Sequence, residues 1–258
     1  MSNAKKSSTR EKAAAARAAA EASERRRDRA VKIGIAAAVV IIVGGIIGGT
    51  LYATRDSGNA STTSANPDAP LPTGVSGPEY GASVGTVETP VLDIYEDFQC
   101  PACAALEAAI SPTLNEMVQA GQVKVTYHPM NFLDRNLGND SSTRAAAAFG
   151  CAVDAGVTLQ YHNAVFANQP EAEGTGYTQE QLKQFGVDAG ITGPALDTFN
   201  TCVDDQTYSD WPFLSNEAAG LRGVTGTPTL FLNGEEVDRS KLVSAEDLKA
   251  QILAAGGQ

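Results

Sequence analysis

Two cysteines lie two residues apart in the stretch FQCPACAALE, residues 98–107. They are Cys100 and Cys103, with Pro101 and Ala102 between them. A pair with this spacing can exchange disulfides with other thiols, form half of a zinc site, or close a short structural bridge. The rest of the chain helps to decide among these three.

A zinc site needs two further ligands at suitable spacing. Cys151 and Cys202 stand alone, on separate predicted helices, and neither His128 nor His162 is spaced to join the pair. A bridge that closes so short a loop also stabilises a protein least. We therefore expect no metal and no cofactor, and we favour a redox-active pair.

Local sequence places the pair at the start of a helix. Residues 91–98, VLDIYEDF, predict a strand rich in apolar and aromatic residues, and residues 101–120 predict a helix. Pro101 suits the first helical position, where its missing N–H would have no partner. The free N–H groups and dipole of a helix N-terminus stabilise an anion, so we expect the pKa of the Cys100 thiol to fall.

A second motif, GVTGTPTLFLNG, spans residues 223–234. Pro228 directly precedes a predicted strand, where proline is unusual outside a strand start or a turn. A cis Thr227–Pro228 bond would turn the backbone so that its polar groups face a peptide lying across the cysteine pair. Asn233 and Gly234 then predict a tight hairpin turn.

The remaining elements complete an α/β pattern. Residues 123–128 predict a second strand, and residues of about 136–222 predict an all-helical block with a helix cap at Ser141 or Ser142. Residues 244–255 predict a closing helix. The order is β-α-β, helices, then β-β-α, as expected for a helical domain inserted into a small α/β unit.

The stretch EDFQCPAC, residues 96–103, followed downstream by GTPTLFLNG, resembles the DsbA-like branch of the thioredoxin superfamily. YHNAVFANQP, residues 161–170, resembles the helical insertion of that branch. The resemblance covers residues of about 80–255. It implies a thioredoxin fold with an inserted helical domain, and thiol–disulfide exchange outside the cytoplasm.

The resemblance also implies roles for individual residues. Cys100 would be the exposed nucleophile and Cys103 its resolving partner. The substrate would lie against Pro101, Ala102, Thr227 and Pro228. We expect exported proteins with cysteines as substrates, and a quinone-linked membrane partner that reoxidises the pair.

Some positions depart from the family pattern. Ala102 stands where the best-known oxidases have histidine, so its side chain can donate nothing to the thiolate. The family often has a buried acid where this chain has Ile94, and the neighbouring Asp93 either replaces it or is an ordinary residue. Glu96 and Asp97 are expected to be solvated loop acids beside the pair.

Four cysteines allow three pairings. Because the first two are adjacent along the chain, the second bridge would join Cys151 to Cys202, and two free buried thiols are the other possibility. His128 and His162 are expected to be hydrogen-bonded structural residues.

Charge divides the chain sharply. Residues 1–32 carry ten basic and four acidic residues, whereas the remainder carries nine basic and twenty-six acidic ones. The uncharged residues 33–54 form a mostly apolar run, and at ~1.5 Å per residue a helix of this length crosses a ~30 Å hydrocarbon core. We favour an uncleaved signal anchor with its N-terminus in the cytoplasm over a cleaved signal peptide.

Residues 55–79 are rich in serine, threonine, proline and glycine and predict a flexible linker. The acidic body argues against nucleic-acid binding. The predicted protein is thus a membrane-anchored disulfide oxidase. A reductase or isomerase, or a non-catalytic peptide-binding module, are the other hypotheses.

Overall fold

The computed structural model describes residues 66–238 and 244–256. The predicted basic segment 1–32 and signal anchor 33–54 lie outside these residues, as do residues 55–65 of the predicted linker, whereas residues 66–79 of that linker are described. Within the described ranges, no helix has both the length and the apolar character required to cross a bilayer.

Within the described residues, five strands form one mixed sheet in the order β1-β3-β2-β4-β5. The central pair, β2 and β3, is parallel, and the other neighbouring strands are antiparallel. The strands are β1 (Ala82–Val84), β2 (Val91–Glu96), β3 (Lys124–Pro129), β4 (Thr229–Leu232) and β5 (Glu235–Glu236).

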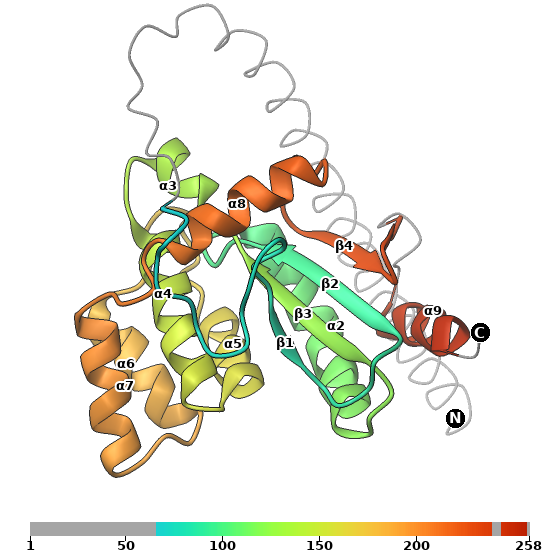
Figure 1. The fold of residues 1–258 in the computed structure, drawn as a ribbon, viewed down its shortest axis with the longest axis horizontal. Helices are drawn as coiled ribbons and strands as arrows, with labels where there is room; N and C mark the ends of the chain where they lie inside the picture. The colour runs from blue at the N-terminus through green and yellow to red at the C-terminus, as the bar shows by residue number, and fades with distance from the viewer. Residues whose placement is uncertain (1–65, 239–243, 257–258) are drawn as a thin grey trace, which may run out of the picture. The chain divides into compact units, whose positions relative to one another are not determined.

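Figure 1 shows helices α4 to α7 grouped together beside the sheet and α2 behind its strands, and α9 packs against α2. Helix α2 (Pro101–Gln119) joins β2 to β3, and α9 (Ala245–Gly256) follows the last strand. The helices between β3 and β4 are α3 (Phe132–Leu137), α4 (Ser141–Asp154), α5 (Thr158–Ala167), α6 (Gln179–Asp188), α7 (Pro194–Asp204) and α8 (Trp211–Leu221).

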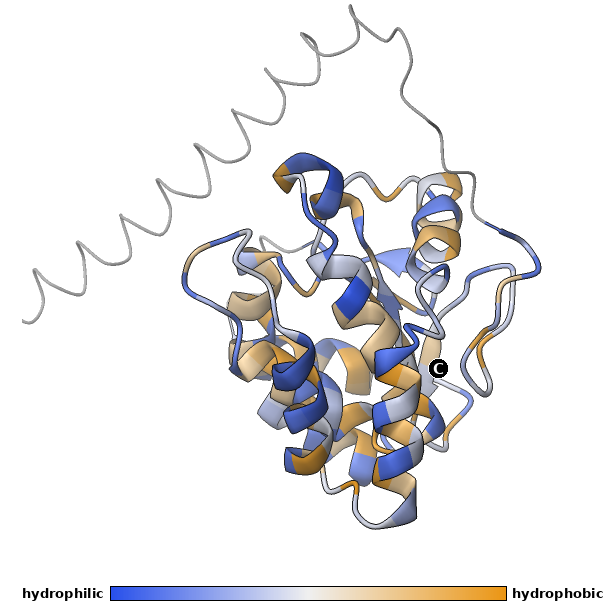
Figure 2. Cartoon of the chain, turned by 90° about the vertical axis from the view of Figure 1, so that its left-hand side faces the viewer, coloured by the Kyte–Doolittle hydropathy of each residue, from blue (hydrophilic) through white to orange (hydrophobic). Residues whose placement is uncertain are grey.

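Alternation along β2 separates two faces of the sheet. Leu92 and Ile94 belong to the main core with the buried face of α2, whereas Tyr95 packs with Phe231 and Ala219 of α8 in a second cluster. Figure 2 shows hydrophobic and hydrophilic residues alternating along the helices, as in elements with one buried side. The sheet therefore has one face towards α2 and another towards α8.

The structure confirms most of the predicted elements. The strand that begins at Val91, the helix after Pro101 and the hairpin at Asn233 all form. Strand β1 and helix α3 were not predicted, because three and six residues carry little periodic signal. The predicted N-cap of α4, Ser141 or Ser142, was wrong, because the observed N-cap is Asp140.

Candidate active site

The cysteine pair occupies the first turn of α2. Cys100 is the N-cap, with an extended backbone at φ −76° and ψ 116°, and Pro101 begins the helix. Both sulfurs are free thiols. Cys100 retains 8% exposure and Cys103 none, so both are buried, and Cys100, which the sequence predicted to be exposed, is only the more accessible of the two.

The two thiols differ strongly in acidity. The pKa of Cys100 falls to about 6, chiefly because the Cys103 thiol donates a hydrogen bond to its sulfur, with further help from the Thr227 side chain and from the backbone N–H groups of Cys103 and Ala102. Burial raises the pKa of Cys103, and the hydrogen bond to Cys100 and the charge of Glu96 raise it further. Ala102 thus stabilises the thiolate through its main chain, although its side chain has no donor.

The loop after α8 brings a second backbone group to the pair. The Thr227–Pro228 peptide bond is cis, as predicted, and the Cys100 thiol donates to the Thr227 carbonyl oxygen at 3.7 Å. Thr229 Oγ1 donates to the Gly226 carbonyl at 2.8 Å and holds the loop at the start of β4. A peptide that reaches Cys100 therefore meets this loop.

The helical block holds the backbone that leads into the pair. Gln169 Nε2 donates to the carbonyl oxygens of Phe98 and Cys100, at 2.8 and 3.1 Å. Tyr177 Oη donates to the same Phe98 carbonyl at 3.2 Å. Gln169 lies in the motif that resembles the family's insertion, but no local pattern in the sequence predicts this contact.

The prediction that Glu96 and Asp97 are solvated was wrong, because both are buried. Asp97 Oδ1 accepts from Ser142 Oγ at 2.6 Å and from the Gln99 N–H at 2.9 Å, while its Oδ2 accepts from the Leu133 N–H at 3.3 Å. Burial raises the pKa of Asp97 to about 7. This carboxyl joins the loop before the pair to the start of α4, where Ser142 is already inside the helix and therefore does not cap it.

Glu96 ends β2 on the core side of the sheet and contacts His162 Nε2 of α5. On the other side of the imidazole, His162 Nδ1 lies 3.9 Å from Glu107 Oε2 of α2. Burial raises the pKa of Glu96 well above its usual value and that of Glu107 to about 7, whereas burial lowers the pKa of His162. Glu107 was not predicted, although it lies one turn after Cys103 on the same helix face.

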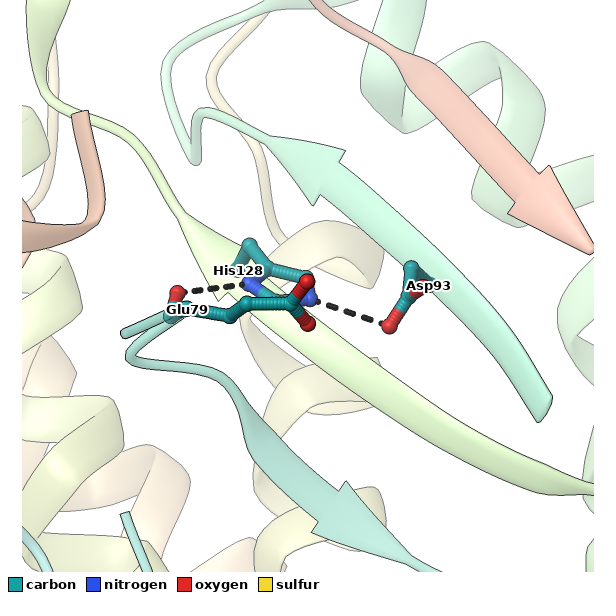
Figure 3. A group of neighbouring side chains, drawn as sticks. All are labelled: Glu79, Asp93 and His128. Atoms are coloured by element: carbon teal, nitrogen blue, oxygen red, sulfur yellow. Dashed lines mark hydrogen bonds and ion pairs between the residues drawn. The ribbon is translucent and has the colours of Figure 1, made fainter. Parts of the chain in front are cut away.

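Asp93 belongs to a different cluster on the opposite face. Figure 3 shows it hydrogen-bonded to His128, and the ring also bonds the Glu79 carbonyl, at 3.2 and 3.1 Å. Arg222 donates to Asp93 Oδ2 and Glu79 Oε1, both at 3.2 Å, and to Tyr95 Oη at 3.0 Å. Asp93 therefore does not replace the missing acid at Ile94, because strand alternation turns it away from the cysteine pair.

Cys151 of α4 and Cys202 of α7 are joined by a disulfide within the helical block. Their Cα atoms are 5.9 Å apart and 51 positions separate them along the chain. Both cysteines lie outside the cluster around Cys100, so the structure assigns them no part in the exchange chemistry.

Several known proteins are similar to this chain. MdbA, a thiol-disulfide oxidoreductase from Actinomyces oris, superposes with a TM-score of 0.58 and 28% identity, covering 67% of this chain and 86% of MdbA. Reduced DsbA from Mycobacterium tuberculosis superposes with a TM-score of 0.57 and 28% identity, covering 69% of this chain and 93% of DsbA.

The serine/threonine-protein kinase PknE of Mycobacterium tuberculosis is 27% identical over 175 residues, which are 65% of this chain. The chain spans only 30% of the length of that kinase. Residues 78–254 match the family described as Thioredoxin. This match includes the cysteine pair, the Thr227–Pro228 loop and the whole sheet, and the chain therefore belongs to the thioredoxin family.

Proposed function

We propose that the chain is a thiol–disulfide oxidoreductase that introduces disulfides into exported proteins through Cys100 and Cys103. The observation that carries this proposal is the contrast between the two thiols. Cys100 retains some exposure and has its pKa lowered to about 6, and Cys103 is fully buried with its pKa raised. This asymmetry suits a nucleophile and a resolving partner.

In the oxidising direction, a substrate thiolate attacks Cys100 Sγ of the Cys100–Cys103 disulfide. The disulfide bond breaks, a mixed disulfide forms, and Cys103 leaves with the electron pair. A second substrate thiolate then attacks the substrate sulfur of the mixed disulfide, and Cys100 leaves as a thiolate. The substrate loses two electrons and the enzyme pair gains them. The low pKa of Cys100 speeds this last step, because a stable thiolate leaves faster.

Glu96 is placed to protonate Cys103 as it leaves. The buried thiolate is unfavourable, and burial raises the pKa of Glu96 well above its usual value, which favours the protonated carboxyl. Glu96 and Cys103 are near enough to interact electrostatically, because ionised Glu96 raises the pKa of the Cys103 thiol. The carboxyl supplies the proton, and Cys103 becomes a neutral buried thiol.

The substrate peptide lies across Cys100 and the loop at Thr227 and Pro228. Pro101 and Ala102 are exposed beside the reactive sulfur and form the other side of this contact. Because these groups are backbone or small and apolar, they favour an extended segment around a cysteine over one particular sequence. This suits an enzyme that acts on several exported proteins.

The domain acts outside the cytoplasm, anchored by residues 33–54, with a quinone-linked membrane partner that reoxidises the pair. The sharp change from a basic to an acidic composition across this apolar run supports this topology. A disulfide within the helical block also suits an oxidising compartment. Carbonate extraction of membranes tests the anchor. Release of the whole protein into the soluble fraction would exclude it.

Refolding of a reduced substrate protein tests the activity. We expect the parent to form disulfides catalytically and C100S to have no activity. If the parent and C100S refolded the substrate at equal rates, the enzymatic function would be excluded and a peptide-binding module would be the remaining hypothesis. The equilibrium potential against glutathione then sets the direction. A value near about −120 mV supports an oxidase, and one near about −270 mV a reductase.

A further inference from the structure

Buried polar atoms without a hydrogen-bond partner gather behind the cysteine pair. Within the described residues, Glu96 Oε2, His162 Nδ1 and Glu107 Oε1 are all in this state, and each side chain is at most 2% exposed. Buried polar groups in folded proteins are nearly always paired, so such a concentration indicates a function. Asn115 Oδ1 and Asn163 Oδ1 are unpaired nearby on α2 and α5.

These atoms follow a line from the strand to the surface. Glu96 contacts one nitrogen of His162, and Glu107 faces the other nitrogen at 3.9 Å. Ser111 Oγ then donates to the Glu107 carboxyl. A neutral imidazole can receive a proton at one nitrogen while it releases a proton from the other, so this order of groups can conduct protons.

The line ends at a cavity of about 290 Å³ between α2 and α5. Its lining includes Glu107, Ala108, Ser111, Asn115 and Asn163. The unpaired oxygens of Glu107 and of both asparagines suit ordered water, which needs two to four polar partners. Cys100 and Thr227 are not part of this lining, so the cavity is separate from the surface that meets the substrate.

We propose that His162 and Glu107 form a proton route that connects Glu96 with water in this cavity. This inference rests on the proposed disulfide exchange. It separates the path of protons from the path of the substrate. The enzyme can then exchange protons with solvent while a bound peptide covers Cys100.

Each oxidation of a substrate moves protons inward along this route. Glu96 donates the proton on its free oxygen to the departing Cys103 thiolate. The His162 Nε2–H proton moves to the other Glu96 oxygen, and Glu107 delivers its proton to His162 Nδ1. Water in the cavity then reprotonates Glu107. The 3.9 Å separation must shorten by about 0.8 Å during transfer to reach hydrogen-bond range.

Other titratable groups face this cluster from the neighbouring elements. Tyr127 of β3 contacts His162 with tilted rings whose centroids lie 4.0 Å apart, and burial raises the pKa of Tyr127, so the phenol stays neutral. Asp97 and the Cys100 thiolate act on Glu96 from the loop and from α2, and both raise its pKa. None of these three groups lines the cavity, so they adjust the proton affinity of the route without forming its outlet to water.

Two variants on α2 test the route. E107Q keeps the shape of the side chain but cannot release and regain a proton, and A108L fills the cavity without changing any titratable group. The matched control is E116Q, an exposed glutamate on the same helix. We would measure how fast a reduced dithiol peptide reduces the oxidised pair across mildly acidic to mildly alkaline pH, together with the equilibrium potential.

We expect E107Q and A108L to slow the reaction by about a hundredfold, the lower end of the range typical for losing an acid–base group, and E116Q to have no effect. E107Q should also lose an inflection near pH 7 from the rate profile. The potential should stay unchanged, because a proton route speeds both directions equally. Parent-like rates, or a potential that changes in step with the rate, would overturn the route. Failure of the parent to exchange disulfides would instead overturn the proposed function.

Discussion

The sulfur of Cys100 lies 3.7 Å from the carbonyl oxygen of Thr227, although 127 positions separate the two residues along the chain. The contact joins the N-terminus of α2 to the loop before β4. Strands β2 and β4 are antiparallel neighbours, and their pairing fixes this approach. The pairing of these two strands therefore sets the distance between the Cys100 sulfur and the Thr227 carbonyl.

The acidity of Cys100 predicts its reactivity. Alkylation of the reduced protein should follow the thiolate, with half of the maximal rate near pH 6, well below the ordinary thiol value of 9.0. Measuring the rate of alkylation against pH checks this, with the modified residue identified by mass spectrometry. Modification mainly at Cys103, or a midpoint near the ordinary thiol value, would contradict the assignment of Cys100 as nucleophile.

The same shift predicts how stability depends on pH in the reduced state. Because the folded pKa of Cys100 is lowered, its contribution is fully present above the unfolded value of about 9 and is lost as pH falls through about 6. Reduced protein should gain up to a few kcal/mol over this range. Urea unfolding at several pH values measures it, and C100S should lack this component.

Asp97 should stabilise the loop before the cysteine pair. D97N cannot accept every hydrogen bond that the carboxyl accepts, so at least one buried N–H or hydroxyl loses its partner. We expect a loss of about 1–3 kcal/mol in the free energy of unfolding. Chemical denaturation measures the loss, with D205N at an exposed position as control. A change no larger than that of the control would show that the buried hydrogen bonds of Asp97 contribute little.

The disulfide between Cys151 and Cys202 should stabilise the helical block without contributing to exchange. Removing both cysteines as C151S/C202S should lower the free energy of unfolding by about 2–5 kcal/mol, since the unfolded chain regains the freedom of a long loop. The rate of reaction with a dithiol peptide should stay close to that of the parent. A large loss of rate in protein that is still folded would assign this bridge a catalytic role.

Arg222 should contribute more than an ordinary surface cation. Its guanidinium pairs with Asp93 and Glu79 and lies 4.1 Å from the ring centroid of Phe231. R222Q should lower the free energy of unfolding by about 1–3 kcal/mol, because Asp93 is 7% exposed and loses its cationic partner.

The matched control for R222Q is K183Q, which breaks an exposed ion pair with Asp204. This control should change stability by less than about 1 kcal/mol. Equal effects of the two substitutions would mean that burial of Asp93 adds nothing to the ion pair.

Sequence alone was enough for the features with a local signal. The spacing of Cys100 and Cys103, the proline at the helix start and the proline before β4 each constrain the neighbouring backbone. Burial of Glu96 and Asp97 could not be predicted this way, because α4 and α5 cover them and no local pattern encodes that contact. The same limit applied to Asp93, whose direction depends on which face of β2 packs against α2.

Strand β2 carries an acid paired with an imidazole on each of its faces. Glu96 meets His162 on one face, and Asp93 meets His128 on the other. The hydrogen-bonded sheet separates these two clusters. Evolution or design can therefore tune proton transfer at the cysteines on one face while the other face keeps the strands and Arg222 in place.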